Sequence, residues 1–436
     1  MDEYLKQVLE QIRCKKAHEA IREELESHIT DQMEDNIAAG MSREEAEQAA
    51  VYDMGNPVTT GISLDKIHRP KPAWQMILLM TVIMFAGVLI HWNIGMPKTC
   101  VHTIAGFGVM LLVYHLDYTR IAEFARQVAV GMFLIGIFSL FYGEAIGGNI
   151  RTFYLFWISF SMFSFFMLYI PVYGAILYSY YGSGYQGLVK AVLWAVPPLF
   201  LALRFPSLTL FLILLVSMTS LLVLAVVKNW FAVAKKKVLL SIGAVVFVLP
   251  VLLLAVTARE AYQIERIRSF LSGNIEWDYV TRTLDDCFAN SVFLGNGVAE
   301  LKTILPDYYN SFILAYLTGT YGYIACIALC AVLALLLFVI FSTVLRQKNQ
   351  LGMMMGFGSG MILLVNIVIN ILENFGILPT SQTFLPFFSQ GGSSVFVCYI
   401  LMGIILSIYR YKDVYSVHLP KRSHKVGLPK VRVTIE

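Results

Sequence analysis

The segment FILAYLTGTYGYIACIALCAVLALLLFVIFSTV, residues 312–344, contains no charged side chain. An α-helix needs about 20 mostly apolar residues to cross a bilayer, so this segment is long enough to span one. Similar apolar runs recur along the 436-residue chain, which is 57% hydrophobic and only 14% charged, with a mean hydropathy of +0.67. Soluble domains carry about 25% charged residues. The sequence therefore predicts an all-α, polytopic membrane protein.

Working outward from this segment, the apolar runs predict ten transmembrane helices. Their expected ranges are 73–93, 100–116, 127–146, 153–178, 187–203, 207–227, 237–257, 312–344, 353–373 and 391–409. Basic residues gather in alternate loops, such as Lys235, Lys236 and Lys237, and in the tail 411–436. The other short loops hold only Lys98, Arg151 and Arg204. By the positive-inside rule, both termini are expected in the cytoplasm.

The segment before the first predicted span has a different composition. Its first 72 residues hold 15 of the 29 acidic residues and predict three short amphipathic helices. Ser42 and Glu45 form a capping box that begins one helix, and Gly55 with Pro57 ends it. We expect a small cytoplasmic helical domain at 1–65 and a basic linker at 66–72. The domain resembles the helical prefix found ahead of several Gram-positive membrane proteins, and its acidic faces favour basic or helical partners.

One loop, 258–311, is unusually long for a compact membrane protein, which favours a function for it. It holds eight carboxylates: Glu260, Glu265, Glu276, Asp278, Asp285, Asp286, Glu300 and Asp307. A second polar segment, 374–390, is interrupted by prolines. The six cysteines and eight histidines show no metal-ligand spacing, so we expect no metal site. We also expect no nucleic-acid partner.

Four segments in this part of the chain resemble the SEDS family of bacterial cell-wall polymerases, the FtsW, RodA and SpoVE group. They are YQIERIRSFL (262–271), VTRTLDDCFANSVFLGNG (280–297), LPDYYNSFILAYLTGTYG (305–322) and ILPTSQTFLPFFSQGGSS (377–394). The last carries the family's Leu-Pro, Leu-Pro and Gly-Gly-Ser-Ser signature. Span number, orientation and loop position agree as well, so the resemblance covers about 73–410.

The resemblance implies a glycosyltransferase in the bacterial cytoplasmic membrane that polymerises lipid II, an undecaprenyl-linked precursor, outside the membrane. It implies a class B penicillin-binding-protein-type transpeptidase as partner and a role in cell division, cell shape or sporulation. No cofactor is required by the sequence, and a divalent cation is compatible with the reaction.

This chemistry needs a base near the acceptor hydroxyl and cations or dipoles around the leaving pyrophosphate. Asp307 is the candidate base, with Asp285, Asp286 and Glu300 as other carboxylates in the loop. Candidate substrate-binding residues are Arg266, Arg268, Lys302, Gly391, Gly392, Ser393 and Ser394. The competing interpretation is that the charges are solvated and the glycines only allow close helix packing. Glu373, near the end of a predicted span, is a further candidate, close enough to the interface to be solvated.

At three places in the chain, acidic residues of the family are replaced by neutral ones. The family reads Leu-Pro-Glu-x-x-Thr-Asp-Phe before span eight, and its essential Asp aligns with Ser311. A later Gly-Glu-Glu is Thr318, Gly319 and Thr320, and an Asp after span five is Ser207. Either Asp307 replaces the missing base, sharing a helix face with Ser311, or catalysis is lost and the protein is a SEDS-like scaffold of a cell-wall synthesis complex.

A lipid-precursor flippase or transporter is the alternative from another class. It would require ionisable residues near the middle of the membrane. Acidic residues are nearly absent from the middle of the predicted spans, which disfavours it.

Overall fold

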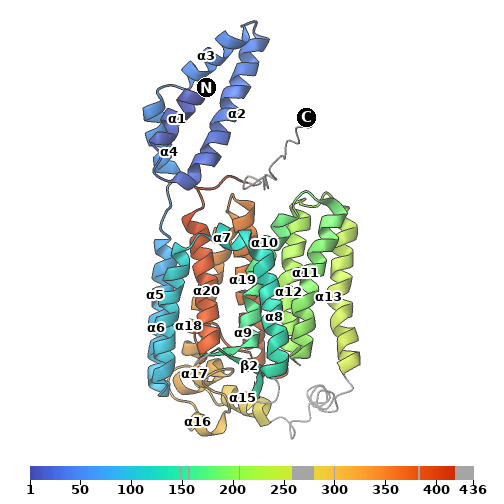
Figure 1. The fold of residues 1–436 in the computed structure, drawn as a ribbon. Coiled ribbons are helices and arrows are strands. Elements are labelled where there is room, and N and C mark those ends of the chain that lie inside the picture. Colours follow the sequence, from blue (N-terminus) through green and yellow to red (C-terminus); the bar gives the residue numbers. More distant parts are fainter. Residues whose placement is uncertain are drawn as a thin grey trace, which may run out of the picture. The chain divides into compact units, whose positions relative to one another are not determined.

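The computed structural model describes residues 1–146, 150–155, 158–205, 207–257, 279–298, 300–381 and 383–417 (Figure 1). The chain forms two compact units. One comprises Met1–Arg69 with the segment that begins at Asp413, and the other comprises Pro70–Lys412. The candidates Arg266 and Arg268, and the first four carboxylates of the long loop, lie outside the described residues.

The first unit has four α-helices rather than the three expected. They are α1 (Asp2–Glu10), α2 (His18–Ala38), α3 (Arg43–Asp53) and α4 (Pro57–Ile67), with the 3-10 turn η1 (Lys15–Ala17) before α2. The additional helix α4 begins because the Asn56 side chain accepts the N–H of Val58 and proline occupies the first helical position. The predicted capping box of Ser42 and Glu45 is confirmed at the start of α3.

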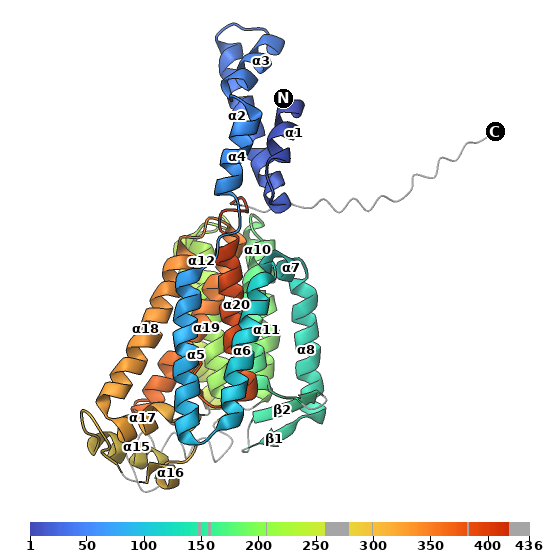
Figure 2. The same cartoon turned by 90° about the vertical axis from the view of Figure 1, so that its left-hand side faces the viewer.

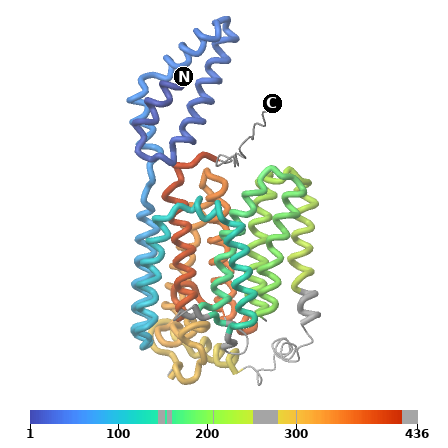
Figure 3. Tube along the Cα trace, in the orientation of Figure 1, coloured from blue at the N-terminus to red at the C-terminus, as the bar shows by residue number. Residues whose placement is uncertain are grey.

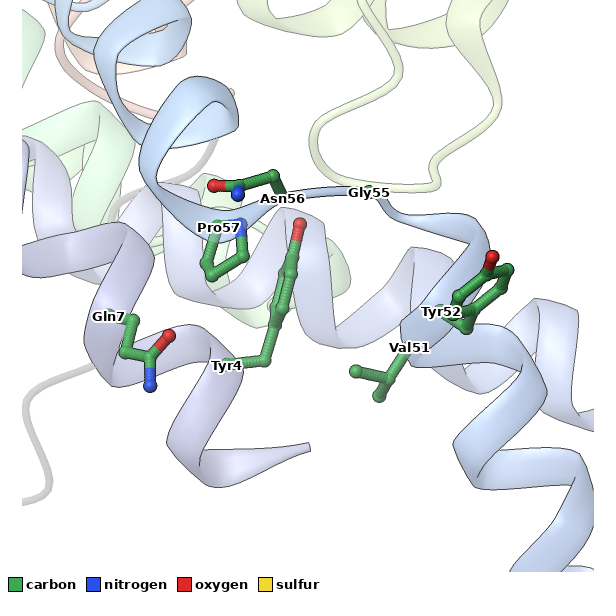
Figure 4. A pocket seen from close by; sticks show the side chains of 7 residues that line it. All are labelled: Tyr4, Gln7, Val51, Tyr52, Gly55, Asn56 and Pro57. Carbon is green, nitrogen blue, oxygen red and sulfur yellow. The ribbon is translucent and has the colours of Figure 1, made fainter.

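A shallow hollow lies in this unit where α1, the end of α3 and the start of α4 meet (Figure 4). It is lined by Tyr4, Gln7, Val51, Tyr52, Gly55, Asn56 and Pro57. The Tyr4 hydroxyl donates to the Met54 carbonyl at 3.0 Å, and Asn56 is occupied as the cap of α4. These two polar groups of the hollow are therefore already used to hold the unit together.

The second unit is mostly helical. Its helices are α5 (Trp74–Ile94), α6 (Pro97–His115), α7 (Tyr118–Glu123), α8 (Ala125–Tyr142), α9 (Met162–Met167), α10 (Tyr169–Ser179), α11 (Gly184–Arg204), α12 (Leu208–Val227), α13 (Lys235–Thr257), α15 (Tyr279–Ala289), α16 (Leu301–Ile304), α17 (Ile313–Tyr321), α18 (Tyr323–Leu345), α19 (Gln350–Asn374) and α20 (Gly392–Arg410). Among the described residues, eight helical segments are long and apolar enough to cross a membrane. The two remaining predicted spans correspond to α6 and α13. The polytopic helical class is thus confirmed.

A small antiparallel sheet replaces the beginning of the predicted fourth span. Strands β1 (Glu144–Ile146), β2 (Ile150–Leu155) and β3 (Ile158–Ser161) pair in that order. The register places Ala145 opposite Arg151, and Phe153 opposite Phe160. The prediction of helix from residue 153 was wrong because this segment is rich in β-branched and aromatic residues, which favour strands. The spanning helix there runs from Met162 to Ser179.

The predicted span 312–344 is also not one helix, because Gly322 separates α17 from α18. Gly322 has φ 90° and ψ 174°, a conformation that side chains disfavour. A Cβ atom there would lie 2.6 Å from the Phe293 carbonyl oxygen. The break therefore follows from a close backbone contact, which hydropathy does not reveal.

Helix α19 contacts α10, α12, α18 and α20, and α20 packs along α6 (Figures 1 and 3). Segments far apart in sequence are therefore neighbours. The Ser407 hydroxyl of α20 donates to the Leu116 carbonyl after α6 at 2.5 Å. Both ribbon views place α15, α16, α17 and the strands at one end of this unit (Figure 2). We call this the loop end; it carries the predicted site.

Candidate functional site

Asp307 and Ser311 meet in the turn that joins α16 to α17. The Ser311 Oγ donates to Asp307 Oδ2 at 2.6 Å, and the Ser311 N–H lies 3.3 Å from the same oxygen. Asp307 has φ 51°, and its carbonyl accepts the N–H groups of Asn310 and Phe312 at 3.0 and 3.3 Å. Helix α17 begins only at Ile313, so the pair does not share a helix face as expected. The turn, rather than helical spacing, brings the two side chains together.

The Ser311 carbonyl is held by two asparagines of α19. Asn370 Nδ2 and Asn374 Nδ2 each donate to it at 3.0 Å. Asn374 Oδ1 accepts the Ala315 N–H at 3.1 Å, so the same side chain also binds the first turn of α17. Both asparagines are completely buried. A fully satisfied buried network rigidifies its surroundings, so α19 fixes the position of the turn.

Glu373 lies in this network and is only 1% exposed, so the interpretation of a solvated side chain was wrong. Its Oε2 accepts the Thr383 hydroxyl at 2.5 Å, and its Oε1 accepts the Ser381 hydroxyl. Thr383 Oγ1 in turn accepts Asn370 Nδ2 at 3.1 Å. A continuous chain of hydrogen bonds therefore runs from Glu373 through Thr383 and Asn370 to the Ser311 carbonyl.

The proline-interrupted segment before α20 packs on the same turn. Ser389 Oγ donates to the Asn310 carbonyl at 2.6 Å, and the Gln390 N–H donates to the Tyr309 carbonyl at 2.9 Å. Asn366 of α19 donates to the Phe384 carbonyl at 2.9 Å. Two of the segments singled out in the sequence, around 307–311 and 384–391, are thus brought together.

The Gly-Gly-Ser-Ser residues form the start of α20, with Gly391 as its N-cap. Ser393 Oγ accepts the Ser161 N–H of β3 at 3.1 Å, and Ser394 is buried. A Cβ atom at Gly391 would collide with the Ser394 hydroxyl, and one at Gly392 would lie 3.8 Å from the His102 ring. Close packing against Ser394 accounts for the glycine at 391, whereas a Cβ atom at Gly392 would make only ordinary van der Waals contact.

The other predicted residues lie on elements that flank the turn. Lys302, on α16, donates to the Ile94 carbonyl at the end of α5, at 3.2 Å. Asp285 and Asp286 are exposed on α15, and Glu300 is exposed at the start of α16 with φ 60°. Helix α15 contacts α17 through Cys287, whose Sγ donates to the Ala315 carbonyl at 3.3 Å. Burial raises the pKa of this thiol, which is consistent with a packing role.

Ser207, at one of the family's acidic positions, and Thr318, directly before two others, have structural contacts. Ser207 caps α12 by accepting the Leu210 N–H at 3.3 Å. Thr318 is buried and donates to the Leu314 carbonyl at 2.7 Å. The capping contact of Ser207 explains why the fold accepts a neutral residue at that position. In the part of the chain that the structure describes, no three His, Cys, Asp or Glu side chains are placed to hold a metal ion.

Sequence reasoning missed the side chains that support the turn. They are Asn366, Asn370, Asn374, Ser381, Thr383 and Ser389. A signal existed, because three asparagines recur every fourth residue towards the end of a predicted transmembrane helix, the last of them directly after its expected boundary. That spacing places them on one helix face, where polar groups bind a neighbouring element.

Comparison with known proteins gives one family and several relatives. The family model described as "Cell cycle protein", FTSW_RODA_SPOVE, matches residues 73–414. The probable peptidoglycan glycosyltransferase FtsW of Geobacter sulfurreducens is 27% identical over 326 residues, 71% of this chain and 83% of the relative. FtsW of Aliivibrio salmonicida is 28% identical over 254 residues, 55% of this chain. That match spans only 60% of the relative's length.

Two solved structures share the fold. A chain from a structure described as "Structural coordination of polymerization and crosslinking by a peptidoglycan synthase complex" has a TM-score of 0.65 at 20% identity. It covers 79% of this chain and 98% of that one. The rod shape determining protein RodA of Thermus thermophilus has a TM-score of 0.55 at 18% identity. The match covers 78% of this chain and 97% of the RodA chain.

Proposed function

Because this chain belongs to the SEDS family of FtsW, RodA and SpoVE, as its match over residues 73–414 establishes, we propose that it is a peptidoglycan glycosyltransferase with Asp307 as its catalytic base. The observation that carries the proposal is the 2.6 Å hydrogen bond from Ser311 Oγ to Asp307 Oδ2. It places a carboxylate beside the position where the family's essential Asp aligns. This contact supports the proposal that Asp307, four residues earlier, supplies the missing acid.

In the proposed reaction, Asp307 accepts the proton of the acceptor sugar hydroxyl. The hydroxyl oxygen forms a bond to the anomeric carbon of the donor sugar, and the bond from that carbon to the pyrophosphate oxygen breaks. The lipid pyrophosphate leaves with the bonding electron pair. Ser311 and Asn310 donate to Asp307 Oδ2, so they orient the carboxylate. Its second oxygen is then the one directed to the acceptor.

Positive charge near the leaving pyrophosphate would come from Lys302 and from Arg266 and Arg268 of the long loop. The backbone N–H groups at the start of α20 add a partial positive charge. The step needs no resident cofactor, and a divalent cation would enter bound to the substrate's pyrophosphate.

The substrate we propose is lipid II, taken from the outer leaflet of the bacterial cytoplasmic membrane, with both termini of the enzyme in the cytoplasm. A class B penicillin-binding-protein-type transpeptidase is the proposed partner. The similarity to a chain of a peptidoglycan synthase complex supports such an assembly. The role in division, shape or sporulation follows from which transpeptidase is bound.

A scaffold without catalysis is the second candidate, supported by the neutral residues at the family's acidic positions, which are Ser207, Ser311, Gly319 and Thr320. A transporter is disfavoured by burial. In the described part of the membrane unit, the buried carboxylates are Asp117 and Glu373, and each lies at the end of a helix rather than in its middle.

The test is polymerisation of labelled lipid II by the purified full chain, alone and with a candidate transpeptidase. Asp307→Asn is compared with Asp286→Asn, an exposed carboxylate of α15 that serves as the matched control. Glycan strands in the wild type and in the control, with none in Asp307→Asn, support the proposal. Strands that persist in Asp307→Asn refute Asp307 as base. An inactive wild type that gains activity on Ser311→Asp identifies the scaffold instead.

A further inference from the structure

A short apolar tip projects from the loop end between α15 and α16. Val292, Phe293 and Leu294 are 43%, 69% and 71% exposed. The residues around them are polar or small, including Asn290 before the tip and Gly295 and Asn296 after it. Leaving two large apolar side chains in water is unfavourable, by an amount that grows with the exposed apolar area. An apolar surrounding outside the chain would therefore stabilise the tip.

The tip is attached to the beginning of α18 through the backbone. The Tyr323 N–H donates to the Val292 carbonyl at 3.0 Å, and the Ile324 N–H donates to the Phe293 carbonyl at 3.1 Å. Gly322 allows this approach, since a Cβ atom there would collide with the backbone of Val292 and Phe293. The tip is accordingly held against the first turn of a spanning helix.

That helix presents an apolar face to the outside of the bundle. Ile324, Ile327, Leu335 and Phe338 of α18 are 43%, 58%, 50% and 71% exposed. In a spanning helix such side chains face lipid. Since the backbone of Val292 and Phe293 is hydrogen-bonded to the first turn of α18, the exposed tip adjoins a helix whose exposed face is apolar.

We propose that the tip, Val292–Leu294, inserts into the lipid leaflet at the loop end and anchors the α15–α17 region to the bilayer. Apolar side chains that anchor in this way reach about 5–10 Å into the boundary between headgroups and acyl chains. The occupant of the surface is lipid because the adjoining face of α18 already lies against it.

The anchor also acts on the site. Gly295 N–H donates to the Tyr321 carbonyl at 3.2 Å, and Gly297 N–H donates to the Gly319 carbonyl at 3.1 Å. Both acceptors belong to α17, which begins two residues after Ser311. On the function proposed above, the depth of the tip in the leaflet would set the height of the Asp307 turn relative to the headgroup of a lipid-linked substrate.

The test places a small environment-sensitive fluorescent amino acid, by stop-codon suppression, at Phe293 or Leu294 of the full chain in lipid nanodiscs. The same residue at Ile327 is the lipid-facing control, and at Asp286 the water-facing control. Nanodiscs with brominated acyl chains then quench any label that reaches the apolar region.

We expect blue-shifted emission at 293 and 294, and loss of most of the fluorescence in brominated lipid, as at 327. Emission and quenching like those at 286 overturn the proposal. A blue shift that appears only when a transpeptidase is added, without quenching by brominated lipid, also overturns it and makes the tip a protein contact. Labels at two positions guard against one variant that fails to fold.

Discussion

Asp307 and Ser311 form a hydrogen-bonded pair, with 2.6 Å between Oδ2 and Oγ, inside a turn rather than along a helix. The carboxylate is half-buried and the hydroxyl is buried, so the pair has a wet side and a packed side. Replacing Asp307 therefore tests the proposed proton acceptor, whereas replacing Ser311 tests the orientation of that acceptor.

Ser311→Ala is expected to retain measurable polymerisation, because Asp307 keeps the Asn310 amide and a backbone N–H as donors. Asp307→Asn is expected to lose about 10²–10⁴-fold, the usual contribution of a general base. Initial rates of lipid II consumption measure both. Equal losses in the two variants would contradict a merely orienting Ser311 and show that the proton passes through its hydroxyl.

Ser311→Asp would put two carboxylates within hydrogen-bonding distance. Like charges so close disfavour double ionisation, so one carboxylate keeps its proton to a higher pH. We expect the pH–rate profile of this variant to rise at higher pH than that of the wild type. Ser311→Asn, which adds no charge, is the control. A profile identical to the wild type would mean that the two side chains do not meet.

Asn370→Ala and Asn374→Ala each remove one of two amide donors from the buried Ser311 carbonyl. Each is expected to cost about 1 kcal/mol in stability, and the double variant more than the sum, since it leaves the carbonyl unsatisfied. Thermal unfolding in detergent measures this. Asn366→Ala, which removes a donor to Phe384 instead, should lower stability without lowering the rate of polymerisation.

Glu373 supports the turn through Thr383 and Asn370, so its replacement should change the rate without changing the pH profile. Glu373→Gln keeps one acceptor oxygen and should lose less activity than Glu373→Leu, which leaves the buried Thr383 hydroxyl and the half-buried Ser381 hydroxyl without this acceptor. A pH–rate profile for each variant separates positioning from catalysis. A shifted profile in Glu373→Gln would make Glu373 a proton-transferring group.

In the first unit, hydrogen bonds from the Ser42 side chain and then its backbone lower the pKa of Glu45 below its usual value of 4.5. A lowered folded-state pKa means that the cap stabilises α3 above the usual pKa and that this contribution is lost as the pH falls through the folded value. Hydrogen exchange in the first turn of α3, corrected for intrinsic rates, should show that loss. Glu45→Gln should remove the pH dependence, whereas Glu44→Gln should retain it.

Much of the fold could be predicted because a long apolar run in a membrane protein forms a helix that crosses the bilayer. The capping box at Ser42 was equally readable, since its two partners are three residues apart. The strands at 144–161 and the break at Gly322 could not be predicted from hydropathy. Both depend on backbone pairing, and Gly322 is set by a contact with Phe293, 29 residues earlier.

The candidate site could also be predicted only in part. Ser311 was found because it aligns with the family's essential Asp, and Asp307 because it is a carboxylate only four residues before it. The asparagines that hold Ser311 come from α19, about 60 residues later, and nothing local to Ser311 indicates them. Glu373 was noticed as an ionisable group in a predicted span. Its partners Ser381 and Thr383 lie in an irregular segment whose conformation cannot be predicted from the sequence.

The dependence of Ser311 on Asn370 and Asn374 has a consequence for biosynthesis. The ribosome makes the Asp307 turn before it makes α19, so a nascent chain that has inserted α17 and α18 has no side chains to hold the Ser311 carbonyl. The segment that carries Ser389 is made later still. The turn therefore acquires its final geometry only when the last two helices join the bundle, and an incompletely synthesised chain in the membrane has no assembled turn.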